Sequence, residues 1–447
     1  MSKTNPEGRA IRDLIVLVLV VGSIPFALTR PWLGVLFWVA VSIAAPQWNV
    51  WGFMREFPLA QVYAIVVFTS LILAREKLRF KWRPEVGFLL LLVACVNLSM
   101  LFAVNPEGAF RKWSITMKMF LLVLAAIYAL NTRKHVELLT ACLAITIGLF
   151  AAKGGLFTLA TGGAYIVHGP NPTWENNGWA AATVVVIPFL VYFVMSVKAR
   201  WLKWCLAATV VLATFSVLGS FSRGGFLALL AMYLFLWRKS KKKVLSIMLL
   251  LPLVAATVVF MPAKWDERMR TIESYQEDNS AMGRINAWKM LFNAANSRPL
   301  LGLGPYPYTP EVFERYAPNP EDIHSAHSMY FEVLGENGYP ALLFFLLMWL
   351  YTWRDASWVI RTSVGRHDLK WAASLMAMVQ ASLIGHFVGG AFLENAYFEP
   401  VYYLLVIVVV VRDIVERQRI TEGAPVKLAP GSSPMAASRA AESKRSV

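Results

Sequence analysis

The chain has 447 residues, of which 57% are hydrophobic and only 16% are charged. Soluble proteins carry about 25% charged residues on average, so this composition excludes an ordinary soluble protein and indicates a polytopic membrane protein. In such a protein the formal net charge of +16 is first a signal of orientation, and only then a hint of an anionic ligand. We expect membrane lipids around the chain and no nucleic acid as a partner.

Thirteen apolar runs that could cross a bilayer, or nearly so, follow one another at residues 11–29, 31–46, 58–74, 86–104, 113–131, 136–161, 179–197, 201–220, 224–237, 244–261, 339–353, 370–393 and 397–411. Strict apolar–polar alternation is absent from them, which excludes a barrel and leaves helices. Because Arg30-Pro31 splits the first two runs, we expect residues 11–46 to make one crossing plus a half-inserted piece. The predicted fold is an all-α polytopic membrane protein with about 12 transmembrane helices and both termini in the cytoplasm.

A long polar segment, residues 262–326, separates two of these runs. It holds seven Lys or Arg and nine Asp or Glu, a net charge of −2, which leaves +18 for the rest of the chain. Basic loops stay in the cytoplasm, so this asymmetry predicts that the segment lies outside. Ile285, Trp288, Leu291 and Phe292 fall on one helical face, and we therefore expect a small helical cap rather than a linker.

The pattern divides the chain into four predicted units. These are an N-terminal transmembrane bundle (1–261), an outer cap with a candidate catalytic segment (262–338), C-terminal transmembrane helices (339–420) and a disordered cytoplasmic tail (421–447). All three cysteines lie inside apolar runs, so we expect neither a disulfide nor a metal cluster.

Three histidines, His168, His324 and His327, fall on the predicted outer side. The pattern from His324 to Gly338 predicts a helix that ends at a C-cap glycine. Such a helix would have His327 in its first turn. The positive end of a helix favours a neutral imidazole, which suits a general base. An interfacial or capping histidine fits the same position equally well. His386, within an apolar run, is compatible with helix packing or with function.

Three cations lie near predicted outer ends of helices. Arg223 follows Ser222 and precedes two glycines, Arg284 opens the amphipathic helix of the cap, and Lys153 precedes Gly154-Gly155. An arginine at such a depth either snorkels to the interface or binds an anion, and its planar fork fits phosphate oxygens bidentately. The first two are candidates for a phosphate clamp, with Lys153 as a further possibility.

Other chemistries lack their motifs in this sequence. We find no H-E-x-x-H, C-x-x-C or P-loop, and Gly302-x-Gly304 is too short for a dinucleotide fingerprint. No Asp-x-Asp occurs in a predicted outer loop. We therefore expect no metal and no cofactor.

Several short motifs, taken in order, resemble the signature of the O-antigen ligase and polymerase superfamily. The residues that carry the resemblance are Gly283-Arg284-Ile285-Asn286-Ala287-Trp288, Arg298-Pro299-Leu300-Leu301-Gly302-Leu303-Gly304-Pro305, His327-Ser328-Met329-Tyr330 with Leu334-Gly335-Glu336-Asn337-Gly338, Ser222-Arg223-Gly224-Gly225, and Glu175-Asn176-Asn177. They extend from about 165 to 340, and the layout of many spans around one large outer loop covers the whole chain. The ligase branch is the more similar one.

This resemblance implies a membrane glycosyltransferase of the C-type. Its members take a glycan from undecaprenyl diphosphate at the periplasmic face of the bacterial inner membrane, and ligases transfer it to lipid A–core. The implied catalytic base is His327, and the implied diphosphate clamp is Arg223 and Arg284 with Lys153. The supporting residues would be His168, Asn176, Asn177, Gly302, Gly304, His324 and Tyr330.

Direct displacement by the acceptor hydroxyl would invert the anomeric centre, and arginines would take the place of a metal. Polymerases and protein-directed O-oligosaccharyltransferases share these motifs. A transporter is a rival from another class, but the sequence shows no broken-helix pattern repeated in two halves. An assembly protein without activity is a third interpretation.

Overall fold

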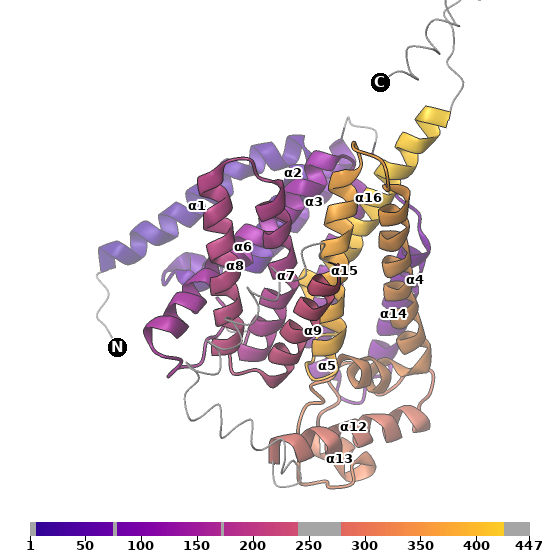
Figure 1. Ribbon diagram of the computed structural model, residues 1–447. Helices are drawn as coiled ribbons and strands as arrows, with labels where there is room; N and C mark the ends of the chain where they lie inside the picture. Colours follow the sequence, from indigo (N-terminus) through magenta and orange to yellow (C-terminus); the bar gives the residue numbers. More distant parts are fainter. Residues whose placement is uncertain (1–5, 75–77, 171–173, 240–278, 424–447) are drawn as a thin grey trace, which may run out of the picture.

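The computed structural model describes residues 6–74, 78–170, 174–239 and 279–423. In these ranges every regular element is a helix, as predicted (Figure 1). The helices are α1 (Pro6–Thr29), α2 (Pro31–Ala44), η1 (Pro46–Asn49), η2 (Phe53–Arg55), α3 (Leu59–Leu73), α4 (Pro84–Leu101), α5 (Pro106–Ala129), α6 (Arg133–Ala160), α7 (Asn176–Ser196), α8 (Arg200–Gly219), α9 (Arg223–Lys239), α12 (Asn279–Ser297), α13 (Pro310–Tyr316), α14 (Met329–Thr362), α15 (Lys370–Gly390) and α16 (Glu399–Gly423).

Eight of the described helices are long and apolar enough to cross a membrane, which supports a multi-pass membrane protein. They contain Ile11–Thr29, Pro84–Leu101, Pro106–Ala129, Arg133–Ala160, Asn176–Ser196, Arg200–Gly219, Met329–Thr362 and Lys370–Gly390. Two more apolar helices, α2 and α3, are shorter. The run predicted at 244–261 lies outside the described residues, so eight is a count for the described part and not for the chain.

Two ends of the bundle can be distinguished in Figure 1, where α12 and α13 lie below it and α16 leaves it at the top. We call these the cap end and the far end. At the far end Arg417, near the finish of α16, donates to the carbonyl of Asn131 just before α6, at 2.9 Å. Trp32 in the first turn of α2 stacks on His135 in the first turn of α6, with ring centroids 4.5 Å apart. Helix α2 therefore starts at the far end.

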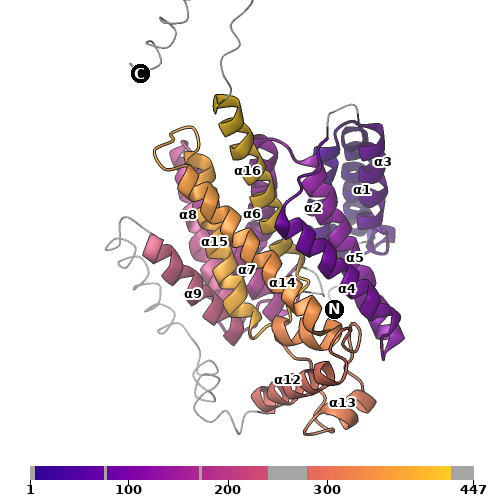
Figure 2. The same cartoon turned by 90° about the vertical axis from the view of Figure 1, so that its right-hand side faces the viewer.

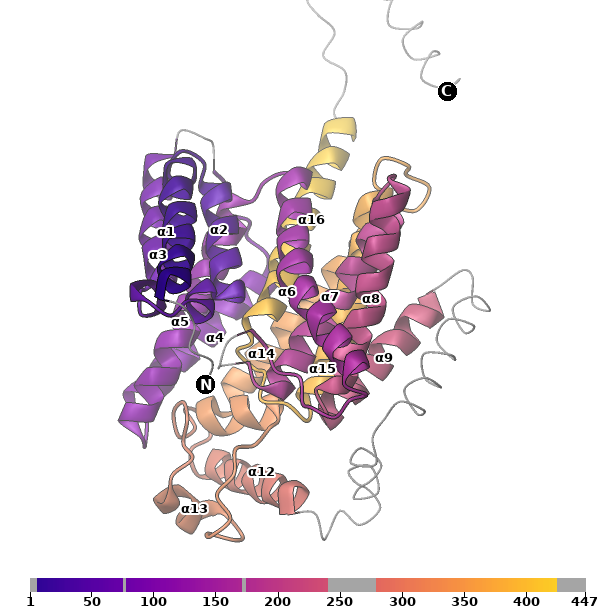
Figure 3. The same ribbon diagram turned by 90° about the vertical axis from the view of Figure 1, so that its left-hand side faces the viewer.

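The first helix runs in the opposite direction to α2, and α1, α2 and α3 stand side by side (Figure 3). Near the finish of α2, Ser42 donates to the carboxylate of Glu399, the first residue of α16, at 2.6 Å. Asp13 of α1 accepts hydrogen bonds from the backbone of Gly52 and Met54, in the connection that follows α2. The amino end of α1 therefore points toward the cap end.

This arrangement disfavours two termini on one side, because α1 begins toward the cap end and α16 finishes at the far end. The termini themselves, residues 1–5 and 424–447, lie outside the described residues, so their sidedness stays a prediction. Pro31 occupies the first turn of α2, where a missing backbone N–H costs no helical hydrogen bond. With 14 residues α2 is shorter than a full crossing, so one crossing by α1 followed by a half-inserted α2 stays a prediction. Arg12 lies over the ring of Trp51 at 5.0 Å, so a basic side chain at the cap end has an aromatic partner.

The described part of the predicted cap is helical and has a small core of its own, formed by Ala287, Met290, Leu291, Ala294, Leu303, Val312, Phe313 and Ala326. It rests on the start of α14 (Figure 2). The predicted apolar face of α12 was partly wrong, because Phe292 is 46% exposed. The buried face follows the spacing Ala287, Met290, Leu291 and Ala294, which is the i, i+3, i+4, i+7 pattern.

Helix α14 is two helices in succession. Gly338 has φ 81° and ψ 179°, so the helical backbone is interrupted there. The amide of Tyr339 donates instead to the carbonyl of Pro299 in the cap, at 2.8 Å. The sequence predicted this stop at Gly338, and the structure confirms it.

We predict that labelling of introduced cysteines will report the direction of α1. In a background with Cys95, Cys142 and Cys205 replaced by serine, Ser297→Cys in the cap and Glu56→Cys in the connection after α2 should react with an impermeant thiol reagent from the same side of the membrane. His367→Cys, between α14 and α15, should react only from the other side, because these helices place it at the far end. If Glu56→Cys and His367→Cys reacted from the same side of the membrane, the proposed direction of α1 would be contradicted.

Candidate active site

Five segments meet at the cap end of the bundle. They are the residues just before α7, the turn from α8 into α9, the connection from α15 to α16, the residues just before α14, and α12 of the cap. Four of them are breaks between helices. Most of the residues singled out from the sequence lie in these segments.

Two asparagines at the start of α7 hold the turn that carries Arg223. The side-chain amide of Asn176 donates to the carbonyl of Ser220 at 3.0 Å, and Ser222 Oγ donates to Asn177 Oδ1 at 2.7 Å. Ser222 Oγ also accepts from the amide of Gly225 at 3.1 Å, as an N-cap does. The asparagines therefore fix the first turn of α9, and with it the position of Arg223.

The glycine after Arg223 permits close helix packing. A Cβ at Gly224 would lie 3.0 Å from Leu393 Cδ2, in the connection between α15 and α16. Leu393 immediately precedes Glu394. The start of α9 therefore packs directly against the segment that carries this carboxylate.

His327 lies outside the helix in which the sequence placed it. Helix α14 starts at Met329 with Ser328 as its N-cap residue, so His327 precedes the cap. Its backbone is left-handed, with φ 43°, a conformation that non-glycine residues adopt only where their surroundings impose it. The predicted place of His327 in a first helical turn is therefore wrong, because a left-handed residue cannot continue the helix backward toward His324.

The charges around His327 support a neutral imidazole for a different reason from the one expected. Partial burial, with the Arg284 guanidinium next in importance, lowers the pKa of His327, and His324 adds to the effect. Glu394 and Glu175 act in the opposite direction on the same pKa. The predicted base and one predicted clamp arginine therefore act on each other electrostatically, although they are 43 positions apart in the sequence.

His324 is more exposed than His327 and pairs with a carboxylate. Its Nδ1 lies 2.6 Å from Asp322 Oδ1, and 45% of its side chain is exposed. The ring lies against Gly283, where a Cβ would be 2.6 Å from Nδ1. The Gly283-Arg284 motif thus leaves room for His324 beside the start of α12.

The two glycines of the cap loop have a structural task. Gly302 and Gly304 have φ of 61° and 84°, the left-handed region that favours glycine. The amide of Leu303 donates to the carbonyl of Gly335, and the amide of Gly304 donates to the carbonyl of Glu336, both at 2.9 Å. The amides of this loop thus donate to carbonyl groups that have no helical partner because the helix is interrupted at Gly338.

The other predicted residues either pack between helices or are exposed. Tyr330 donates to the carbonyl of Phe387 at 3.0 Å and so ties α14 to α15. His168 and Lys153 are exposed, and Gly154-Gly155 beside Lys153 packs against α8. His386 is buried, with its ring 6.0 Å from that of Trp349, which fits the packing interpretation.

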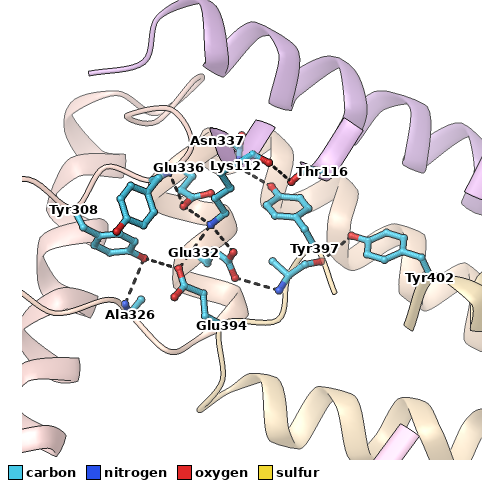
Figure 4. A network of polar contacts seen from close by, with 12 residues as sticks. Lys112, Thr116, Tyr308, Ala326, Glu332, Glu336, Asn337, Glu394, Tyr397 and Tyr402 are labelled. Carbon is cyan, nitrogen blue, oxygen red and sulfur yellow. Dashed lines mark hydrogen bonds and ion pairs between the residues drawn. The ribbon is translucent and has the colours of Figure 1, made fainter. Parts of the chain in front are cut away.

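Sequence reasoning missed a buried charge cluster at the same end (Figure 4). Lys112 Nζ of α5 lies 2.7 Å from a carboxylate oxygen of Glu332 and 2.7 Å from one of Glu336, and 3.7 Å from Glu394. Tyr308 OH donates to Glu394 Oε1 at 3.3 Å. Burial, with Glu394 next, raises the pKa of Tyr308, so the hydroxyl keeps its proton.

A pattern in the sequence could have indicated this cluster. Glu332 and Glu336 are four residues apart in a helical segment, which puts both carboxylates on one face. Such a pair at the edge of an apolar bundle requires a cation. Lys112 directly precedes the apolar run 113–131. A lysine at the end of such a run is normally interpreted as a residue at the membrane–water interface.

The three carboxylates could in principle hold a metal ion, because oxygens of Glu332, Glu336 and Glu394 lie within 4.8 Å of one another. The ammonium of Lys112 already stands 2.7 Å from two of them. A divalent ion would have to displace it. We therefore interpret Lys112 as the cation of this cluster.

The fold and site define a helical multi-pass membrane protein with an imidazole, a guanidinium and buried carboxylates gathered beneath a small cap. Comparison with known families gives two matches. Residues 208–346 match the family model described as O-antigen ligase, and residues 11–198 match a model described as a family of unknown function (DUF5935). No curated protein matches the chain.

The first match confirms, over these residues, the resemblance to the O-antigen ligase and polymerase superfamily, and this family indicates a glycosyltransferase-like enzyme. The matched segment contains Arg223, Arg284 and His327. The second match contains Lys112, Asn176 and Asn177, which contact the first segment.

We predict that Glu394→Gln lowers the pKa of His327. The carboxylate stabilises the imidazolium, so its removal should shift the His327 titration to lower pH. Histidine NMR titration in micelles, assigned with His327→Gln, measures this shift without any assay of activity. Glu314→Gln on the exposed side of α13 is the matched control and should leave the titration where it is; an unchanged His327 titration in Glu394→Gln would refute the coupling.

Proposed function

We propose that the protein is an O-antigen ligase, which transfers a glycan from undecaprenyl diphosphate to a hydroxyl of lipid A–core at the periplasmic face of the inner membrane. The observation that carries the proposal is the position of His327 beside Arg284, at the cap end, inside the segment that matches the O-antigen ligase family. An imidazole beside a guanidinium supplies a base and an anion-stabilising group at one place.

The proposed reaction is a direct displacement. The acceptor oxygen gives its proton to the unprotonated ring nitrogen of His327 and forms a bond with the anomeric carbon. The bond from that carbon to the diphosphate oxygen breaks, and the leaving group takes its electron pair. Attack opposite the leaving group inverts the anomeric centre.

The leaving diphosphate gains negative charge in the transition state, and guanidinium groups in fixed positions stabilise it. Arg284 acts electrostatically on His327, and Arg223 starts a helix whose first turn is fastened by Asn177 and Ser222. We propose both as the diphosphate clamp, and Lys153 as a weaker contributor at the membrane surface. The proposed reaction uses no metal and no cofactor, because arginines neutralise the diphosphate.

The charge distribution supports an outward-facing cap. The segment 262–326 carries −2 against +18 for the rest of the chain, and the far end holds basic residues such as Arg412, Arg417 and Arg419. Cytoplasmic loops collect such residues. The acceptor and donor would therefore meet on the periplasmic side.

The product that accumulates in cells lacking the protein tests the class of transfer. Lipid A–core without glycan supports a ligase. Core with single repeats would indicate a polymerase, and an unmodified glycoprotein would indicate a protein-directed transferase. Turnover of a lipid-diphosphate glycan by the purified protein in proteoliposomes separates all three from a transporter.

We predict that His327→Ala reduces kcat by about 10²–10⁴-fold, the usual contribution of a positioned base, while donor lipid still binds. His327→Gln keeps a hydrogen-bonding side chain but cannot take a proton, so it should be as slow. The comparison is made in proteoliposomes with equal amounts of inserted protein. Normal turnover by the Gln variant would exclude a base, and equal loss in His324→Ala would show that the two histidines cannot be assigned separately.

We predict that Arg223→Lys and Arg284→Lys lose nearly as much activity as the alanine variants. A lysine is a point charge and does not reproduce the bidentate fork, and loss of one such donor costs about 10²–10³-fold in kcat. Arg315→Lys, on α13 of the same cap, is the matched control and should stay near wild type. Near-normal kcat in both Lys variants would rule out the clamp.

A further inference from the structure

We propose that Lys112 is a positioning residue for the transferase site, and that through it the segment of unknown function at residues 11–198 completes the site. The inference rests on the proposed function. It assigns a role to a residue that touches no substrate in our mechanism, and to a part of the chain whose family carries no known activity.

Lys112 connects helices and loops that are far apart in the sequence. Its ammonium lies 2.7 Å from both Glu332 and Glu336 of α14, and 3.7 Å from Glu394 in the connection between α15 and α16. Each carboxylate in turn holds a further segment. Glu332 accepts from the amide of Ala396 at 3.1 Å, and Glu336 accepts from the amide of Tyr306 at 3.0 Å.

A short chain of contacts leads from this cluster to His327. Glu394 accepts from Tyr308 OH at 3.3 Å, and the same hydroxyl accepts from the amide of Ala326 at 3.4 Å. Ala326 is the residue before His327. His327 therefore lies between two fixed segments. On one side the amide of Ala326 is bonded to Tyr308, and on the other Lys112 holds Glu332 and Glu336 of α14.

The ammonium is committed to these internal contacts. Only 20% of the Lys112 side chain is exposed, and those of Glu332 and Glu336 are 3% and 0% exposed. Buried carboxylates repel one another and lose hydration, so removing the cation between them is strongly destabilising. Lys112 thus acts on the reaction through the residues it holds and not through a contact with the donor.

The two family matches meet at this cluster and at one other place. Lys112 belongs to the match of unknown function, whereas Glu332 and Glu336 belong to the O-antigen ligase match. Asn177 of the first segment likewise holds Ser222 of the second, next to Arg223. The segment of unknown function therefore positions residues beside both the proposed base and the proposed clamp.

The test compares Lys112→Met, Lys112→Arg and wild type in proteoliposomes that contain lipid-linked donor and acceptor. We expect kcat per folded molecule to fall by about 10²-fold in Lys112→Met, while KM for the donor stays within about threefold, because the clamp arginines are unchanged. Lys112→Arg restores the positive charge and should recover at least tenfold in kcat. The matched control is Arg111→Met. Arg111 directly precedes Lys112 in α5 and forms an exposed ion pair with Glu107, so this variant should behave as wild type.

A loss of folding in Lys112→Met does not end the test. The double variant Lys112→Met with Glu336→Gln removes one positive and one negative charge, so the cluster keeps its net charge and should insert and fold. It should still be slow in kcat, because Glu394 and Glu332 have lost their cation. Normal kcat in a folded Met or double variant would overturn the role of Lys112 and leave the transferase intact; absence of transfer by the wild type would overturn the proposed function itself.

Discussion

An ammonium group buried in a helix bundle keeps its charge only if anions surround it, and buried carboxylates need a cation for the same reason. Lys112 and the three carboxylates around it meet both needs at once. Removing one partner of such a buried pair typically costs about 3–5 kcal/mol, because the other charge is left uncompensated. Helix α5, the first half of α14 and the connection before α16 are therefore held in one arrangement, and the segment that carries His327 is built on it.

The remaining chemistry lies where helices are interrupted. Within lipid every backbone polar group must be satisfied, so a helix can break only where another segment supplies partners. At Gly338 these partners come from Pro299 and from the amides of Leu303 and Gly304. At the start of α9 Asn176 donates to the carbonyl of Ser220, and Ser222 Oγ, which donates to Asn177, accepts from the amide of Gly225. The motifs that resemble those of the O-antigen ligases contain both the proposed reacting groups and the residues that make these interruptions possible.

Hydropathy and motif spacing predicted the helical membrane fold, the helical cap, the stop at Gly338 and the family. They could not predict the setting of His327, because a left-handed residue before an N-cap has no periodic signature. Lys112 was missed for a different reason: its partners are more than 200 positions away, and at the edge of an apolar run it looks like an interfacial flank. The exposed side chain of Phe292 could not be predicted either. Helical periodicity gives the angular position of each residue around the helix axis, but not which side of α12 the rest of the cap covers.

The direction of α1 has a consequence for how the chain enters the membrane during synthesis. If the cap end faces the periplasm, as we propose, the amino end of α1 must cross the bilayer ahead of its apolar residues, carrying Arg12 with it. This opposes the usual retention of basic residues on the side of synthesis. Helix α1 packs against α2 and α3, so its final direction can be set after these neighbours have been made. Insertion of the first three helices as one unit, rather than one after another, is the order of assembly that this arrangement favours.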